Sequence, residues 1–159
     1  MERVVVGIGE WSVLKSNGVL VCLGLGSCVG IALYDSTKKI GGLVHILLPI
    51  PQNSDNTNPT KFASTGIPFL LEEILRLGAG RQSIVAKIVG GSQMFSIKGR
   101  EDKINIGARN VEVTRDTLKK LGIPIVGEDV GGNFGRTMEF FVSNGTVKVK
   151  AIGRGEKEI

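Results

Sequence analysis

Glycine constrains the fold of this chain more than any other residue type. It occupies 23 of the 159 positions, about twice its usual share in globular proteins. A residue without a side chain weakens helix interiors and permits sharp turns. The sequence therefore favours many tight turns between short strands over a helical bundle.

Apolar residues make up 42% of the chain, which is enough to bury a sizeable core. A length of 159 residues suits one domain and is too short for two comfortable ones. We therefore predict a single domain over residues 1–159. Residues 153–159 are expected to form a mobile tail.

Hydrophobic periodicity predicts mainly strands. The strongest hairpin signals are Asn17-Gly18 and Asn144-Gly145. One helix is expected to be capped by Ser64 or Thr65 and to end near Gly78, and a second to be capped by Asn105. The expected strands lie at residues 4–8, 13–15, 19–23, 29–34, 41–48, 84–89, 123–130, 137–143 and 146–152, and the second helix at 108–121.

Hairpins dominate this pattern, so we predict an α+β fold. It would contain mixed, mostly antiparallel, β-sandwich-like sheets flanked by two main helices on one side. Residues 52–60 are polar and predict a surface loop, which could form a rim over a site that includes the preceding strand.

Charge and hydropathy argue against two classes of partner. The net charge is +5, but Lys and Arg are scattered and interleaved with acids, and the eight aromatics offer few stacking platforms, so we expect no nucleic-acid binding. The longest apolar stretches, such as residues 43–50, are too short to span a bilayer, and the first residues do not form a secretory signal. We expect a cytoplasmic protein with no membrane insertion.

Cys28 and His45 are the candidate catalytic residues. Cys28 lies in a glycine-rich turn, Gly24 to Gly30, and His45 is the single histidine of the chain. A free thiol has a pKa of about 8.5 and needs a nearby base to act at neutral pH. Because consecutive strands usually pair, the two residues are expected to meet. The alternative is a packing cysteine and a satisfied core histidine.

Backbone N–H groups near Ser27 and Gly26 could stabilise an oxyanion next to Cys28. The two cysteines, Cys22 and Cys28, should be free thiols in a reducing compartment. With one histidine they lack the ligand count of a zinc site, so we expect no metal. The Gly90-Gly91 run has neither a P-loop nor a dinucleotide-binding spacing, so we expect no organic cofactor.

Five sequence blocks together resemble the chemoreceptor glutamine deamidase family, CheD, in order along nearly the whole chain. They are Leu25-Gly-Ser-Cys28, His45 with Leu48-Pro49, Lys87 to Phe95, Ile106-Gly-Ala-Arg-Asn110, and Asp129-Val-Gly-Gly-Asn-Phe-Gly-Arg136.

The resemblance implies a cysteine hydrolase that converts glutamine side chains on the cytoplasmic helices of chemotaxis receptors to glutamate and releases ammonia. For some members it also implies hydrolysis of glutamyl methyl esters. It implies a fold similar to deamidating bacterial toxins, Cys28 as nucleophile and His45 as general base. An activated Cys28 should then alkylate rapidly well below pH 8.5.

The third catalytic position of the family is usually a threonine, and Cys22 stands there in this chain. A thiol is a weak hydrogen-bond partner. Three readings follow: Cys22 orients the imidazole poorly, a backbone carbonyl orients it instead, or the enzyme is slow. Of these, we expect the backbone carbonyl. Cys22 could equally be a small core residue.

The family is also known to bind a chemotaxis phosphatase, CheC. The resemblance therefore leaves a second function open, a regulatory module that binds receptors and a CheC-type phosphatase and has little or no hydrolase activity.

Overall fold

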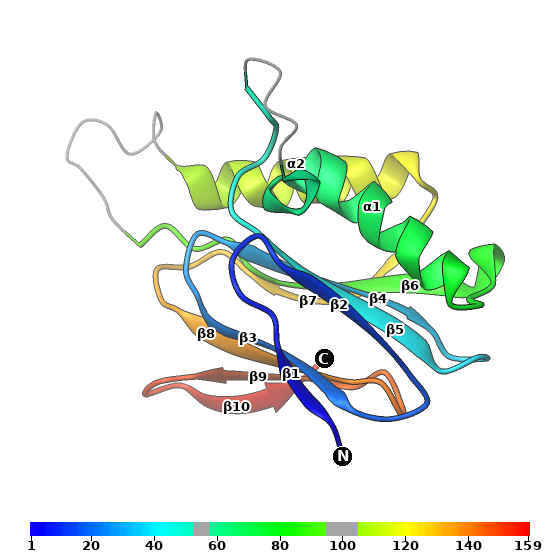
Figure 1. The fold of residues 1–159 in the computed structure, drawn as a ribbon. Helices are drawn as coiled ribbons and strands as arrows, with labels where there is room; N and C mark the ends of the chain where they lie inside the picture. Colours follow the sequence, from blue (N-terminus) through cyan, green and yellow to red (C-terminus); the bar gives the residue numbers. More distant parts are fainter. Residues whose placement is uncertain (53–57, 95–104) are drawn as a thin grey trace.

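The described residues form two stacked five-stranded sheets and two main helices (Figure 1). The computed structural model describes residues 1–52, 58–94 and 105–159. The helices lie together on one face of one sheet, here called the helix-covered sheet, and the other sheet, the outer sheet, packs against its opposite face. Among the described residues the fold is therefore α+β, as the sequence predicts, with three layers.

The helix-covered sheet has the strand order β2-β5-β4-β6-β7 and is antiparallel except for the β6–β7 pair. Its strands are β2 (Trp11–Lys15), β5 (Ile40–Ile46), β4 (Val29–Asp35), β6 (Ile84–Gly90) and β7 (Ile125–Val130).

The outer sheet has the order β1-β3-β8-β9-β10 and is antiparallel except for the β1–β3 pair. Its strands are β1 (Arg3–Val5), β3 (Val19–Leu25), β8 (Arg136–Phe141), β9 (Val147–Ala151) and β10 (Gly155–Glu158). The hairpin predicted at Asn144-Gly145 joins β8 to β9, and Gly145 has the positive φ of +81° that such a turn requires.

The Asn17-Gly18 hairpin is wrong. A tight turn does join β2 to β3, but β2 pairs with β5 in the helix-covered sheet while β3 pairs with β1 and β8 in the outer sheet. The turn therefore carries the chain from one sheet to the other. The turn has positive φ at Ser16 (+69°) and Gly18 (+107°) but not at Asn17, so it is not the two-residue turn of an Asn-Gly hairpin. The Asn-Gly pair signals only that the chain reverses, and it does not say which sheet the next strand joins.

The two main helices are α1 (Ala63–Arg76) and α2 (Ile106–Lys120), with short 3-10 helices at Pro59–Lys61 and Arg81–Ser83. Asn105 caps α2 as predicted, because its side chain accepts a hydrogen bond from the N–H of Ala108. The cap predicted for α1 is wrong.

Helix α1 begins before Ser64 and Thr65, and its N-cap, Phe62, makes no side-chain cap hydrogen bond. Thr65 instead donates its hydroxyl to the carbonyl of Pro59, at 2.6 Å.

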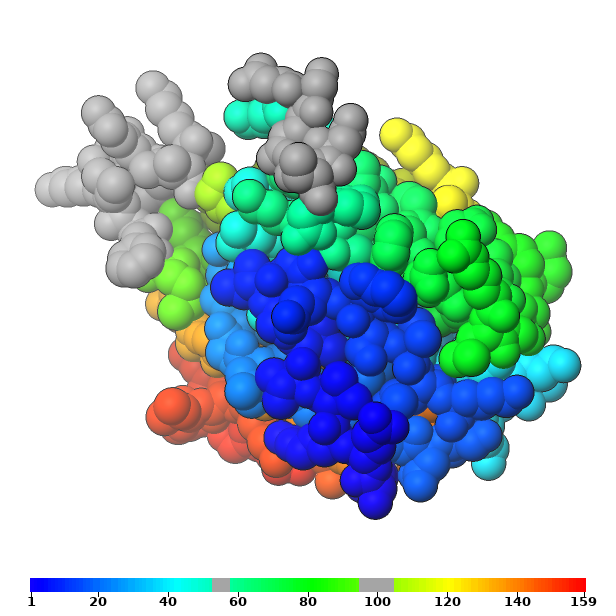
Figure 2. Space-filling model, in the orientation of Figure 1, coloured from blue at the N-terminus to red at the C-terminus, as the bar shows by residue number. Residues whose placement is uncertain are grey.

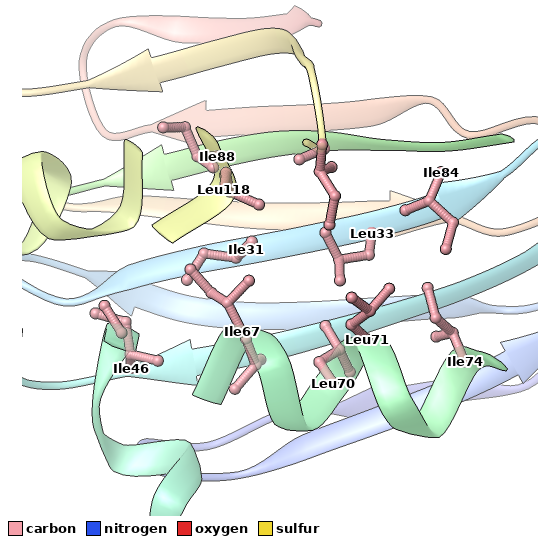
Figure 3. Close-up of a cluster of buried hydrophobic side chains, with 14 of the residues drawn as sticks. Ile31, Leu33, Ile46, Ile67, Leu70, Leu71, Ile74, Ile84, Ile88 and Leu118 are labelled. Atoms are coloured by element: carbon pink, nitrogen blue, oxygen red, sulfur yellow. The ribbon is translucent and has the colours of Figure 1, made fainter. Parts of the chain in front are cut away.

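Two hydrophobic clusters fill the spaces between the layers. The helix-side cluster lies between the helices and β4, β5 and β6, and Figure 3 shows many of its isoleucine and leucine side chains. The inter-sheet cluster lies between the two sheets and includes Cys22, Cys28 and Phe140. Along β4 and β5 alternate residues enter one cluster or the other, as strand geometry requires.

The C-terminal segment differs from the predicted mobile tail. Residues 155–158 form β10, which pairs with β9. Main-chain hydrogen bonds carry the pairing, and Ile159, which follows β10, bonds to the main chain of Val147 and packs against the inter-sheet cluster. Exposed charges add weak contacts, because Glu156 approaches Lys148 and Lys150, and Lys157 approaches Asp129. Within the described residues no helix is long and apolar enough to cross a membrane.

Candidate active site

Cys28 and His45 lie on the same face of the helix-covered sheet. His45 is the register partner of Gly30 across the antiparallel β4–β5 pair, and Cys28 stands two residues before Gly30. Cys28 belongs to the inter-sheet cluster, whereas Val29 belongs to the helix-side cluster. The thiol and the imidazole are thus diagonal neighbours on the inner face, a relation that places Cα atoms about 7–8 Å apart and lets side chains meet.

The imidazole of His45 is held by a main-chain oxygen. Its Nδ1 lies 2.9 Å from the carbonyl oxygen of Val6, and the side chain is buried. A carbonyl only accepts, so Nδ1 carries the hydrogen and Nε2 presents its lone pair. The main chain of His45 is also fixed, since its N–H donates to Glu10 and its carbonyl accepts from Gly9.

The N-terminal segment therefore orients the candidate base. Figure 2 shows this segment, in dark blue, on the near side of the molecule. In this arrangement a backbone carbonyl orients the imidazole, as expected for a chain that has Cys22 where the family usually has threonine.

Burial shifts the pKa values of both candidate catalytic groups toward their neutral forms. It lowers the pKa of His45, and the Val6 hydrogen bond and the charge of Glu10 oppose this in part. Burial raises the pKa of the Cys28 thiol, and a hydrogen bond from its own main-chain N–H opposes this. Both directions favour a neutral thiol and a neutral imidazole at rest, whereas the rapid alkylation expected from the sequence would need a lowered thiol pKa.

Cys22 reaches the same space from the opposite sheet. It lies in β3, fully buried, and its Sγ is 3.2 Å from where a Cβ on Gly30 would stand. Burial and the nearby Cys28 raise its pKa far above the usual range, so it is a neutral thiol. The structure brings Cys22, Cys28 and His45 together around Gly30.

Two neighbouring main-chain groups support the turn that carries Cys28. The N–H of Ser92 donates to the carbonyl of Gly26, and the N–H of Gly91 donates to that of Cys28, both at 2.8 Å. Gly90 permits this approach, because a Cβ there would lie 2.2 Å from the Cys28 carbonyl oxygen. The Gly90-Gly91 run therefore supports the turn that carries Cys28 as well as reversing the chain.

A buried arginine fixes that supporting loop. Arg136 donates through Nη1 to the Ser92 hydroxyl and to the Gly131 carbonyl, both at 2.7 Å. It also approaches Asp129 at 3.4 Å and stacks on the ring of Phe134. The Asp129–Arg136 block thus acts on the site indirectly, by holding Ser92.

Helix α2 supplies a further contact to the turn. The side-chain amide of Asn110 donates to the carbonyl of Ser27 at 2.9 Å and to that of Leu47 at 3.0 Å. Its place in the Ile106–Asn110 block is the one sequence signal for Asn110, and that block does not indicate these contacts. Its partners lie 83 and 63 residues away, so local patterns could not reveal them.

The surface beside the site is partly apolar. Met94 is 44% exposed and covers Gly26, where an added Cβ would lie 3.1 Å from its Cγ. A pocket of about 460 Å³ follows the end of the His45 strand, with lining residues Leu48, Pro49, Ile50, Gln52, Lys61, Phe62, Ile106 and Arg109.

Residues 53–57, most of the predicted rim loop, lie outside the described residues. Over the part of the chain that the structure describes, no group of three or more His, Cys, Asp or Glu side chains could hold a metal ion.

Comparison with known families decides the classification. The family model described as CheD chemotactic sensory transduction matches residues 47–151. The chain belongs to the CheD family. The matched region contains Asn110, Ser92 and Arg136, which support the turn, whereas Cys28 and His45 precede it.

Relatives in the CheD family match almost the whole chain. One from Caldanaerobacter subterraneus subsp. tengcongensis is 55% identical over 97% of this chain and 96% of its own. Others are from Moorella thermoacetica, 51% identical over 99% and 96%, and from Clostridium botulinum strain Hall, 47% identical over 100% and 99%. Each of the three is named "Probable chemoreceptor glutamine deamidase CheD".

A solved structure also aligns with this CheD-family chain. It is the hypothetical protein YfiH of Bacillus licheniformis, with 17% identity and a TM-score of 0.42, over 72% of this chain and 46% of that one.

Proposed function

We propose that this protein is a cysteine hydrolase that converts glutamine side chains of chemoreceptors to glutamate and releases ammonia. The observation that carries the proposal is the placement of Cys28 and His45 on one inner face, with His45 held in the tautomer that a general base needs. The names of its full-length relatives supply the substrate class.

The reaction begins from the neutral pair. His45 Nε2 takes the thiol proton as Cys28 Sγ attacks the amide carbon of glutamine, which gives a tetrahedral oxyanion and an imidazolium. Main-chain N–H groups of Ser27 and Cys28 are the donors that we assign to the oxyanion. The imidazolium then gives its proton to the amide nitrogen, the C–N bond breaks, and ammonia leaves a thioester on Cys28.

Hydrolysis of the thioester completes the cycle. His45 takes a proton from water as the water oxygen attacks the thioester carbon, and returns it to the sulfur as the C–S bond breaks. The products are a glutamate side chain and the free thiol. The same steps applied to a glutamyl methyl ester would release methanol in place of ammonia, and we propose this as a secondary activity.

A macromolecular substrate needs an open surface near the thiol. The exposed Met94 beside the nucleophile turn and the apolar pocket after the His45 strand support docking of an amphipathic receptor helix there. The cytoplasm, which holds the proposed receptor segments, is the proposed compartment. The likeness to deamidating toxins stays a prediction.

The test is deamidation of a purified chemoreceptor cytoplasmic fragment, scored for each glutamine by mass spectrometry. Cys28→Ala is the control. In water carrying the heavy oxygen isotope, each new glutamate should gain one heavy oxygen. A Cys28→Ala variant with full activity would refute the covalent route.

A second candidate function is favoured by the raised pKa of the buried Cys28 thiol. It is a regulatory module that binds receptors and a CheC-type phosphatase and has weak hydrolase activity. Wild-type protein that binds either partner tightly but deamidates no glutamine would support this module instead.

A further inference from the structure

Three consecutive carbonyls of the nucleophile turn are occupied by donors from outside the turn. Those of Gly26 and Cys28 accept main-chain N–H groups of the Gly91–Ser92 loop, and that of Ser27 accepts the Asn110 amide. Of these three contacts, the hydrogen bond to the Ser27 carbonyl is the one donated by a side chain.

The Ser27 carbonyl shares its peptide group with the N–H of Cys28. In a planar trans peptide the C=O and N–H point in opposite directions. Asn110 holds the oxygen on the side of α2, so the Cys28 N–H points away from α2, toward the inter-sheet side on which the Cys28 side chain lies. A donor beside the nucleophilic sulfur is correctly placed for the oxyanion that forms when this sulfur attacks.

Asn110 is itself rigidly placed. Its side chain is fully buried, and its two amide hydrogens serve two acceptors, the carbonyls of Ser27 and Leu47. Leu47 lies two residues after His45, so one side chain ties the nucleophile turn to the end of the strand that carries the base.

Close packing holds the first turn of α2 on the supporting loop. A Cβ on Gly107 would lie 2.2 Å from the carbonyl oxygen of Ser92. The helix that carries Asn110 therefore approaches the loop as closely as a glycine permits. Because Asn110 is fully buried, it acts through the peptide and does not touch substrate.

We infer that Asn110 is a positioning residue that fixes the Ser27–Cys28 peptide so that the Cys28 N–H serves as an oxyanion donor. The inference rests on the proposed function, since it concerns the same reaction. Without the Asn110 amide the peptide can rotate and turn its carbonyl toward the site, which removes the donor.

The matched variants are Asn110→Leu and Thr114→Val. Leucine keeps a similar volume and removes both donors. Thr114 lies one helical turn further along α2, is equally buried, and has a hydroxyl that finds no hydrogen-bond partner among the described residues. Thr114→Val thus perturbs the same helix face without removing a hydrogen bond to the turn. Asn110→Ala serves as a second variant if Asn110→Leu fails to fold.

The kinetics of receptor-fragment deamidation should distinguish the Asn110 variant from the Thr114 variant. We expect kcat of Asn110→Leu to fall about 10- to 1000-fold, with KM within about twofold, because the donor acts in the transition state. Thr114→Val should keep its kcat within about twofold. Equal kcat values for wild type and a folded Asn110 variant would overturn the inference.

The rate of Cys28 alkylation by iodoacetamide distinguishes a positioning role from a general structural defect, because a structural defect would change this rate as well. This reaction forms no oxyanion, so Asn110→Leu should affect it only through the pKa of the thiol. Loss of the Cys28 N–H should shift the alkylation pH profile upward, while the rate at high pH, where the thiol is fully ionised, should match wild type. A parallel loss of alkylation and deamidation would assign Asn110 a role in packing alone and overturn the inference.

A nuclear magnetic resonance measurement needs no activity and no variant. In the wild-type protein both side-chain amide protons of Asn110 should be protected from solvent exchange, and rapid exchange of either would overturn the inference. A wild type that deamidates no receptor glutamine while these protons are protected would refute the proposed function and leave the hydrogen bonds established.

Discussion

His45 and Val6 join the two sheets through one hydrogen bond, between Nδ1 of the imidazole and a main-chain oxygen 2.9 Å away. The bond sets the tautomer of the candidate base without a polar side chain. A chain with Cys22 where the family usually has threonine can thus still fix the tautomer that leaves the Nε2 lone pair free of the Val6 contact.

Replacement of the base should remove turnover while the fold survives. We expect His45→Ala to lower kcat about a hundred- to ten-thousand-fold, the usual contribution of a positioned general base. Mass spectrometry of the receptor fragment measures the rate, and circular dichroism verifies the fold. A His45→Ala variant with more than a tenth of wild-type kcat would contradict the assignment.

The pH dependence should have one acid limb. Protonated His45 cannot accept the thiol proton, so kcat/KM should fall as pH drops through the pKa of His45. Burial lowers that pKa, so the limb should lie below about pH 6.5, the usual histidine value. Initial deamidation rates between pH 5 and 8 measure it, and a midpoint above 7 would contradict the neutral resting site.

Alkylation of the free protein should need a higher pH than an ordinary thiol does. Because burial raises the Cys28 pKa and the thiolate is the reactive form, the rate should keep rising above about pH 8.5. Iodoacetamide labelling read by mass spectrometry measures it, with Cys28→Ala reporting labelling at Cys22. Fast labelling of Cys28 at pH 6 would instead indicate that Cys28 and His45 rest as a thiolate–imidazolium ion pair.

Restoring threonine at position 22 should change activity little. Since Val6 already orients the imidazole, we expect Cys22→Thr to hold or slightly raise kcat, within about threefold. Cys22→Val is the matched control, with threonine's shape but no hydroxyl. If threonine exceeded valine more than tenfold, the hydroxyl itself would contribute to catalysis.

Gly90 should tolerate no side chain. A Cβ there would lie 2.2 Å from the Cys28 carbonyl, and φ is +115°, so Gly90→Ala should lower the free energy of unfolding by about 3 kcal/mol or more. Gly131 has φ +84° but nothing within 4 Å of an added Cβ, so Gly131→Ala should cost about 1–2 kcal/mol. Urea denaturation measures the free energy of unfolding of both variants. Equal decreases in the two variants would contradict a steric clash at position 90.

The sequence could predict the central pair because it depends on consecutive strands. β4 and β5 follow one another, so their antiparallel pairing, and with it the proximity of Cys28 to His45, follows from short-range connectivity. The partner of the imidazole could not be predicted in the same way. Val6 contributes a main-chain oxygen from 39 residues away, and main-chain atoms leave no mark in the sequence.

Long-range pairing also accounts for two wrong predictions, the Asn17-Gly18 hairpin and the mobile tail. An Asn-Gly turn reverses the chain but does not decide which sheet the next strand joins. The β9–β10 pairing depends on main-chain hydrogen bonds and on the packing of Ile159 against the inter-sheet cluster, and a short charged segment gives no periodic apolar signal.

Val6 is bound through its main chain to Val21 in the outer sheet, while His45 belongs to the helix-covered sheet. The alignment of the candidate base thus depends on how the two layers of the sandwich are stacked. A substitution in the inter-sheet cluster could slide one layer over the other. It would then slow proton transfer from the thiol to the imidazole, although every side chain of the site was unchanged.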